Sequence, residues 1–243
     1  MRRGLTLIEV LVAVGVIGLL VAILAPTLAG ARGLAQQSVS LNNARQCWGI
    51  VEDYAQANQE RYPRCLPNTA YGAPGGAGGA SSSEVGAAYL TITLWFSAVR
   101  DVAPFHQHRE VFVSPGRQFT EGSFAASYRL MPAFFIKGTL WTETATSMSE
   151  AELASLARDV RRNEVSFPAG KAGMYDYDLS YVRKPRPRID GLPDEPTAVA
   201  FADGHAGARN PQDAAEPFPN AHQPDQPPVR LHDTPRGAQG RDY

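Results

Sequence analysis

The feature that most constrains this chain is an apolar run close to its start. Residues 5–25 contain a single ionisable side chain, that of Glu9. As an α-helix with a rise of about 1.5 Å per residue, this run extends roughly 30 Å, which is enough to cross the hydrocarbon core of a bilayer. Two arginines, Arg2 and Arg3, precede it, so the positive-inside rule places the N-terminus in the cytoplasm and the rest of the chain outside. The sequence therefore predicts a transmembrane helix over residues 5–28.

A cleaved secretory signal peptide is the alternative interpretation of this run. A signal peptide has a shorter apolar core, which is followed by a small-x-small cleavage site. Residues 29–31 (Ala-Gly-Ala) resemble such a site and keep this alternative open. A signal peptide gives Glu9 no role, however. A plain signal anchor, in which the glutamate occurs by chance, gives it no role either.

Glu9 is a functional candidate because an unpaired carboxylate inside a membrane costs several kcal/mol. No Lys or Arg follows it within two helical turns, so its partner must be the chain's own N-terminal region or another molecule. If the chain were cut after Gly4, Leu5 would carry a free α-ammonium group. That group could pair with the Glu9 of a neighbouring subunit, which would neutralise both charges and fix the register of an assembly.

The segment Arg-Arg-Gly-Leu-Thr-Leu-Ile-Glu-Val-Leu-Val-Ala, residues 2–13, closely resembles the class III signal of type IV pilins and type II secretion pseudopilins. The resemblance implies that residues 1–4 are a leader, that a prepilin peptidase cleaves after Gly4, and that the new amino group of Leu5 is methylated. Family members usually have Phe where this chain has Leu5. The residues to which the resemblance gives a role in assembly are Thr6, Glu9 and Pro26.

The same resemblance implies partners and a location. The partners would be the prepilin peptidase, other pilin or pseudopilin subunits, and an inner-membrane assembly platform that serves protein transport. The chain would cross the bacterial inner membrane once, with its head periplasmic or, after assembly, extracellular. Nucleic acid is not an expected partner, because 23 Lys and Arg against 24 Asp and Glu leave a net charge of −1 and little to neutralise phosphates.

Beyond the apolar run the pattern stays helical and becomes amphipathic. Apolar residues recur every seven positions, with two more between them, and they leave polar residues on the other faces. We therefore expect the stem helix to continue through residues 29–62, to end near Arg61 before Pro63, and to pack on the domain that follows. The residues of this predicted stripe are Leu34, Leu41, Ala44, Trp48, Val51 and Ala55.

Later segments resemble, more loosely, the pilin-like proteins of planctomycete-type bacteria. The matching pieces are Tyr-Ala at 54–55 with Tyr-Pro at 62–63, Val-Phe-Val-Ser-Pro at 111–115, Ser-Tyr at 127–128 and Phe-Ala-Asp-Gly-His at 201–205. Ser114 stands where these proteins often have Cys. That departure leaves Cys47 and Cys65 as the one possible disulfide pair.

The sequence of residues 63–208 predicts an exported α+β head. Strand-like segments occur at 110–113, 125–131, 172–177 and 197–202, and residues 90–105 favour a helix over a strand. A Ser-x-x-Glu capping box at Ser149 predicts a helix that ends near Asn163. Asp203-Gly204 predicts a two-residue hairpin turn of type I′. We expect a type IV pilin-like fold in which the long N-terminal helix packs on a small antiparallel sheet.

Two segments of the chain contain too few apolar residues to build a core. Residues 72–83 (Gly-Ala-Pro-Gly-Gly-Ala-Gly-Gly-Ala-Ser-Ser-Ser) predict a flexible surface loop. Residues 209–243 hold seven prolines and few apolar residues, so their burial would not offset the entropy lost on ordering. We expect them to form a mobile tail.

The sequence offers weak candidates for other kinds of site. His106, His108 and His205, with Asp203, could bind zinc in a secreted metalloenzyme, but solvated histidines are favoured because metal sites need three or four converging ligands. Calcium could bind acidic residues of the head, although no EF-hand pattern occurs. No nucleophile or phosphate-loop motif is present, so no enzyme, metal or cofactor is expected. The acidic residues considered for calcium are Asp176, Asp178, Asp190, Asp194 and Glu195.

The sequence thus predicts a non-catalytic structural subunit of a type IV pilus or type II secretion-like filament. The main alternative is a single-pass membrane-anchored module that binds a ligand such as a glycan through aromatic side chains. The aromatic residues considered for that role are Trp95, Trp141, Tyr175 and Tyr177.

Overall fold

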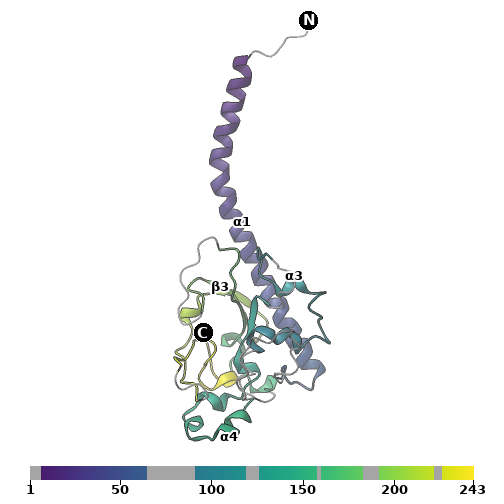
Figure 1. Ribbon diagram of the computed structural model, residues 1–243, viewed down its shortest axis with the longest axis vertical. Helices are drawn as coiled ribbons and strands as arrows, with labels where there is room; N and C mark the ends of the chain where they lie inside the picture. The colour runs from purple at the N-terminus through teal and green to yellow at the C-terminus, as the bar shows by residue number, and fades with distance from the viewer. Residues whose placement is uncertain (1–6, 65–90, 119–125, 158–159, 183–191, 222–225) are drawn as a thin grey trace, which may run out of the picture.

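The computed structural model describes residues 7–64, 91–118, 126–157, 160–182, 192–221 and 226–243. Helix α1 (Leu7–Ala57) is a single long helix. Figure 1 shows its N-terminal part projecting away from a head into which its C-terminal part is packed. The predicted 72–83 loop lies outside the described residues.

The head is organised around a four-stranded antiparallel sheet with the spatial order β1-β2-β3-β4. Leu130 pairs with Met174, Tyr175 with Val199 and Ala200 with Ala206. Every residue of β2 and β3 is buried, and α1 packs against these central strands. The long helix on a small antiparallel sheet confirms the predicted α+β fold. The strands are β1 (Tyr128–Leu130), β2 (Ala172–Asp176), β3 (Thr197–Phe201) and β4 (Ala206–Arg209).

The C-terminal part of α1 buries the predicted stripe from Ala44 onward. Trp48 is the centre of this contact, and its ring lies against Gly173, where the pairing of β2 with β3 shifts register. A Cβ on Gly173 would lie 2.4 Å from the indole, so only glycine lets the strand approach this closely. The prediction is wrong for Leu34, which is 68% exposed on the projecting part of the helix.

Helix α1 ends at Ala57, four residues earlier than predicted. The Glu60 amide donates to the Ala55 carbonyl at 2.8 Å, and both Gln59 and Glu60 have left-handed backbone angles. Such a closing bond satisfies a carbonyl that the helix end would otherwise leave unpaired. The chain then pairs through Arg61 with Arg161 as a short antiparallel bridge.

Other predictions about elements of the head need correction. Residues 110–113 are not a strand, because α3 (Arg109–Phe112) is a short helix that turns Phe112 into a cluster of aromatic rings. The Ser149 capping box is confirmed, but its helix α4 (Glu150–Ala154) ends well before Asn163. Residues 91–94 are helical and lead into the short helix η2 (Trp95–Ser97), as favoured.

The hairpin at Asp203-Gly204 is present, but its turn type differs from the prediction. The Gly204 amide donates to the Phe201 carbonyl at 2.9 Å, and Gly204 alone has a positive φ, of +90°. This is a three-residue loop closed by a left-handed glycine. The Asp203 carboxylate accepts bonds from the amide and the Nδ1 of His205, at 3.1 and 2.6 Å.

The prediction of a mobile tail at 209–243 is wrong for the described part of that segment. Buried polar side chains replace the missing apolar ones: Asp233 accepts bonds from Trp141 Nε1 and Asn220 Nδ2 at 2.9 and 3.2 Å. At the end of the chain, Asp242 forms a buried ion pair with Lys171, 3.1 Å apart, and accepts the Ala172 amide at 2.9 Å. The segment is therefore a packed layer of the head.

Replacing Asp242 with Ala should unfold the head more easily. The substitution leaves the fully buried ammonium of Lys171 without its carboxylate, and breaking a buried pair in this way costs about 3 kcal/mol or more. Thermal unfolding of the full chain in detergent micelles, followed by near-ultraviolet circular dichroism, would measure it. Asp101→Ala removes an exposed carboxylate and is the control. Equal unfolding temperatures for Asp242→Ala and wild type would contradict this account of the C-terminal segment.

The His232 side chain makes the stability of the head depend on pH. It lies 3.0 Å from the Tyr175 hydroxyl, and burial together with the charge of Arg129 lowers the pKa of His232 to about 3. The unfolded chain binds a proton near pH 6.5 and the folded chain does not. Stability therefore falls as the pH drops from 6.5 towards 3, by up to about 1.4 kcal/mol per pH unit. His232→Gln should flatten this part of the stability profile in denaturation series between pH 7 and 4. A profile as steep as that of wild type would refute the assignment.

Candidate functional site

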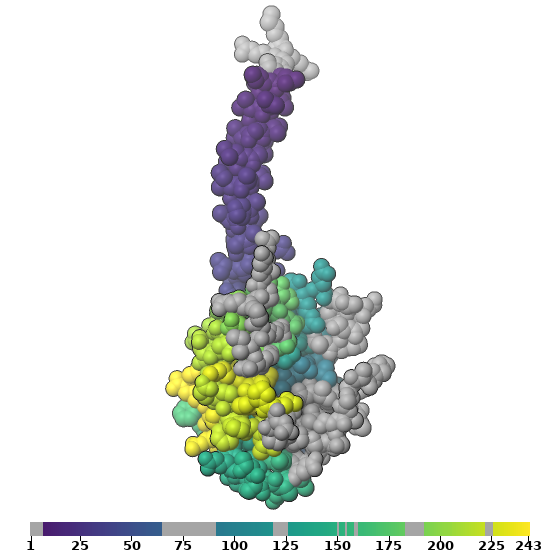
Figure 2. All heavy atoms as spheres, turned by 60° about the vertical axis from the view of Figure 1, so that its left-hand side comes forward, coloured from purple at the N-terminus to yellow at the C-terminus, as the bar shows by residue number. Residues whose placement is uncertain are grey.

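The candidate functional site is the projecting part of α1. It is long and apolar enough to cross a membrane, and none of its most apolar stretch is buried against the described residues. Leu7 is 84% exposed and Leu28 71% exposed, and Figure 2 shows the stem standing clear of the head. A water-soluble monomer rarely exposes so large an apolar surface. The exposed stem is therefore compatible with a membrane anchor.

Glu9 and Pro26 lie on this stem, whereas Gly4, Leu5 and Thr6 lie outside the described residues. Glu9 is exposed close to the end of α1 that is farthest from the head. The helix continues through Pro26, which has no amide to donate to the preceding turn. In the same turn, Thr27 Oγ1 donates to the Leu24 carbonyl at 2.8 Å. The structure thus places a carboxylate and a weakened helical turn on the same apolar rod.

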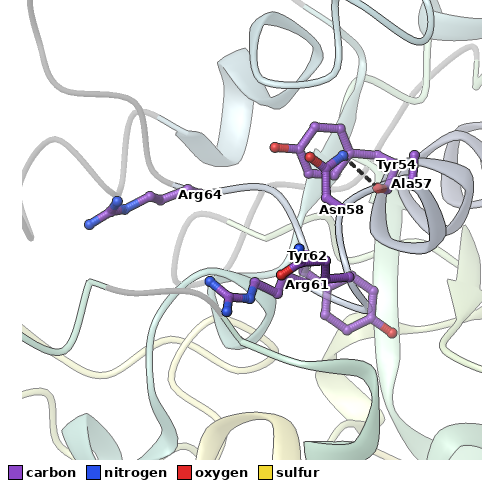
Figure 3. A pocket seen from close by; sticks show the side chains of 7 residues that line it. Tyr54, Ala57, Asn58, Arg61, Tyr62 and Arg64 are labelled. Atoms are coloured by element: carbon purple, nitrogen blue, oxygen red, sulfur yellow. Dashed lines mark hydrogen bonds between the residues drawn. The ribbon is translucent and has the colours of Figure 1, made fainter.

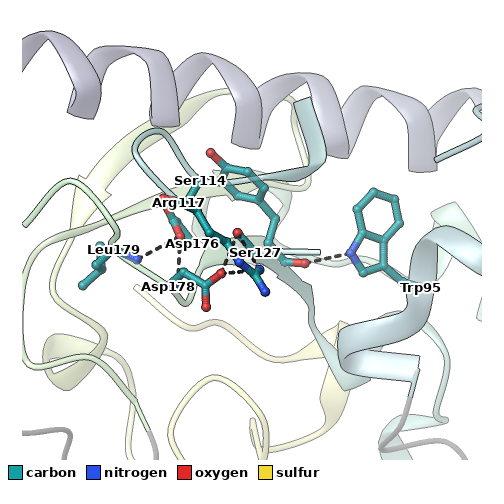
Figure 4. Close-up of polar contacts among 8 residues, drawn as sticks. Trp95, Ser114, Arg117, Ser127, Asp176, Asp178 and Leu179 are labelled. Atoms are coloured by element: carbon teal, nitrogen blue, oxygen red, sulfur yellow. Dashed lines mark hydrogen bonds and ion pairs between the residues drawn. The ribbon is translucent and has the colours of Figure 1, made fainter. Parts of the chain in front are cut away.

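A buried carboxylate fastens the stem to the head. Both Ser40 of α1 and Ser114 donate hydroxyl bonds of 2.7 Å to Oδ2 of Asp176, at the end of β2. The amides of Asp178 and Leu179 donate to its Oδ1 at 3.0 and 3.3 Å (Figure 4). These four bonds satisfy both oxygens of a fully buried side chain. The network joins three segments that are distant in the sequence.

Burial dominates the electrostatics of this junction. Desolvation raises the pKa of Asp176, although its hydrogen bonds act in the opposite direction. Burial and the nearby Asp176 also raise the pKa of Tyr128, whose hydroxyl donates to Ser40 Oγ at 3.2 Å. Beside them, Arg117 pairs with Asp178 at 2.6 Å. Through Ser40, these contacts join α1 to the end of β2.

Sequence reasoning missed most of this junction. Ser40 and Asn43 are polar residues on the buried face of an amphipathic helix, and that mismatch is the signal that could have found them. Asn43 donates to the Glu110 carbonyl at 2.9 Å, which helps to hold α3 against the stem. In the sequence, Ser114 stands out only as a departure from Cys. Asp176 is one of the acidic residues considered for calcium, and both of its carboxylate oxygens accept hydrogen bonds in this junction.

Cys47 is a free, buried thiol. It contacts the Val111 carbonyl at 3.3 Å, and burial raises its pKa well above the ordinary value. Cys65 lies outside the described residues. The structure therefore assigns Cys47 to the packing between α1 and α3, and it shows no disulfide at this residue.

The aromatic residues considered for ligand binding are not available for it. Trp95, Trp141 and Tyr175 are almost fully buried, and Trp95 Nε1 donates to the Tyr128 carbonyl at 2.7 Å. Tyr177 is half-buried, with the Arg129 guanidinium 3.1 Å above its ring. Trp95, Trp141 and Tyr175 thus belong to the core, and Tyr177 is partly buried against it.

The residues considered for metal binding are not brought together. Among the residues that the structure describes, no group of three or more His, Cys, Asp or Glu side chains could hold a metal ion. His106 and His108 line a surface pocket next to α3, while His205 bonds to Asp203 in the β3–β4 turn. Asp178 pairs with Arg117, Asp194 and Glu195 lie half-exposed near β3, and Asp190 falls outside the described ranges.

Comparison with known proteins gives a match for the start of the chain and none for the head. Residues 1–25 match a family model described as the prokaryotic N-terminal methylation motif. No curated protein and no solved structure matches the chain. The planctomycete-type resemblance of the head stays a prediction. The matched motif supports a type IV pilin-like or pseudopilin signal at the start of this chain, and points to a structural subunit rather than an enzyme.

Proposed function

We propose that this chain is a pilin or pseudopilin subunit of a type IV pilus or type II secretion-like filament. A prepilin peptidase cleaves after Gly4, and the amino group of Leu5 is methylated. The stem holds the subunit in the bacterial inner membrane, with the head on the periplasmic side. An assembly platform then transfers subunits into the filament, where neighbouring stems replace lipid.

The observation that carries the proposal is the apolar stem, exposed on every side and rigidly joined to a folded head. The stem carries the methylation motif. Packing against other stems keeps its apolar surface out of water once the subunit leaves the bilayer, and exposure of that surface would cost about 25 cal/mol per Å². Glu9 gives the assembly its specificity. In an apolar bundle, its carboxylate is best placed beside the cationic Leu5 amine of a neighbour, because both charges are then compensated.

Pro26 has a second role in this proposal. A helix that lacks one backbone bond bends or loosens more easily at that turn, so stems can adjust to one another as they leave the bilayer. Thr6 lies between the cleavage site and Glu9, where neighbouring stems begin to touch.

Cell fractionation tests this proposal. Wild type should appear in sheared filament fractions of its host, or in a periplasmic assembly, as well as in the inner membrane. Gly4→Leu should block processing and confine the chain to the membrane, whereas Gly30→Ala, a glycine with open space around it on the same helix, should behave as wild type. Assembly of an unprocessed Gly4→Leu chain would contradict the proposal.

A further inference from the structure

A polar pocket lies where α1 ends, beyond the stem and its junction. Its volume is about 330 Å³, which is at the small end for ligand sites. Its walls carry two guanidinium groups, two phenol rings and two carboxamides, and they contain no carboxylate. The lining residues are Tyr54, Ala57, Asn58, Gln59, Arg61, Tyr62 and Arg64.

The side chains of this pocket come from the last turns of α1 and from the segment that follows it. Figure 3 shows Tyr54 and Asn58 on one side and Arg61 and Tyr62 on the other, with the guanidinium ends of Arg61 and Arg64 extending to the same side. Asn58 Nδ2 donates to the Tyr54 carbonyl at 2.8 Å, which orients its amide. Tyr62 is held as a wall, because its hydroxyl donates to Glu52 at 2.7 Å.

The backbone around the pocket is fixed before any ligand arrives. The Arg162 amide donates to the Glu60 carbonyl at 3.0 Å, and the Tyr62 amide donates to the Val160 carbonyl at 2.9 Å. Arg162 also pairs with both Glu52 and Glu60, at 2.7 Å each. These bonds hold the segment in its left-handed turn, so a ligand would meet a preorganised wall and lose less free energy to ordering.

We propose that this pocket binds a carboxylate-bearing sugar, such as a uronic acid residue of an acidic polysaccharide. Guanidinium groups bind carboxylates through charge-assisted bonds, which are stronger than neutral ones. Carboxamides supply donors and acceptors for sugar hydroxyls, and the half-exposed ring of Tyr54 offers an apolar face to a sugar ring. The inference does not depend on filament assembly, because the pocket lies within one chain.

The arginines have an alternative, purely structural role that the test must separate. Cations near the C-terminal end of a helix interact favourably with its dipole, so Arg61 and Arg64 could simply stabilise α1. That role predicts a lower unfolding temperature when they are replaced. It predicts no difference between acidic and neutral sugars.

Calorimetric titration of the full chain in detergent micelles tests the inference, with trigalacturonate as the acidic probe and galactotriose as its neutral match. Trigalacturonate should bind at least about tenfold more tightly than galactotriose. Arg61→Gln with Arg64→Gln should lose at least about tenfold in affinity. Arg100→Gln, which removes an exposed arginine outside the pocket, should bind as wild type does.

Equal binding of the two sugars, or unchanged binding by the double variant, would overturn the inference. It would also be overturned if inorganic phosphate and free galacturonate displaced trigalacturonate equally effectively. Tyr54→Leu should weaken trigalacturonate binding while the unfolding temperature stays near that of wild type. None of these outcomes bears on filament assembly, so a failure here leaves the proposed function untouched.

Discussion

Glu9→Val is expected to abolish assembly while leaving membrane insertion intact. The substitution makes the stem more apolar, so insertion is at least as favourable as before. It also removes the negative charge that, in the proposed filament, compensates the Leu5 amine of the neighbour. An unpaired charge in an apolar bundle costs several kcal/mol, and even about 1.4 kcal/mol per subunit contact lowers the association constant tenfold.

The measurement compares assembled with membrane-bound protein for each variant. We expect the assembled fraction of Glu9→Val to fall at least about tenfold, whereas Glu9→Asp keeps the charge and a part of assembly. Val10→Leu changes the neighbouring exposed apolar side chain and serves as the matched control. Assembly of Glu9→Val at the wild-type level would remove the pairing role of this carboxylate.

Trp48→Ala is expected to produce the largest loss of head stability. Its ring is fully buried between the stem and the sheet, with its centroid 4.7 Å from that of Phe134 and 5.7 Å from that of Tyr62. Truncating such a residue leaves a cavity and costs about 4 kcal/mol. The unfolding temperature of the full chain in micelles should drop sharply. Leu34→Ala, on the exposed part of the same helix, should change little.

A double-mutant cycle with Gly173 makes this prediction specific. Gly173→Ala alone forces a methyl group into the indole and should cost about 2 kcal/mol. In the Trp48→Ala background the methyl group has space, so its cost should shrink by at least about 1 kcal/mol. Strictly additive effects would mean that the contact between stem and sheet is not organised around this pair.

The sequence predicts the stem and the central sheet because both rest on strong local patterns. An apolar run of this length has few alternatives, and the segments of β2 and β3 are short apolar runs flanked by turn residues. The strand prediction for residues 110–113 is wrong because a tertiary contact outweighs the local pattern. Their apolar, β-branched pattern is local, but one side chain, Phe112, gains more by entering the aromatic cluster than the segment would gain by pairing as a strand.

The C-terminal segment and the junction depend on contacts that no local pattern reveals. Asp233 and Asp242 look like ordinary solvated acids, and their burial makes sense only when Trp141 and Lys171 are brought to them from about 70 to 90 residues away. The same holds for Ser40 and Asp176, which are separated by 136 positions. The polar, Pro-rich composition of the C-terminal segment predicts mobility. The described part of the segment is ordered instead, because its polar side chains form long-range hydrogen bonds.

The most direct test of the account is the mass and sequence of the mature N-terminus, measured on protein extracted from the membranes of its host. The account predicts a chain that begins at Leu5 and carries one methyl group on its amine. A chain that keeps residues 1–4, or one trimmed after residues 29–31 and so without the apolar run, would contradict it.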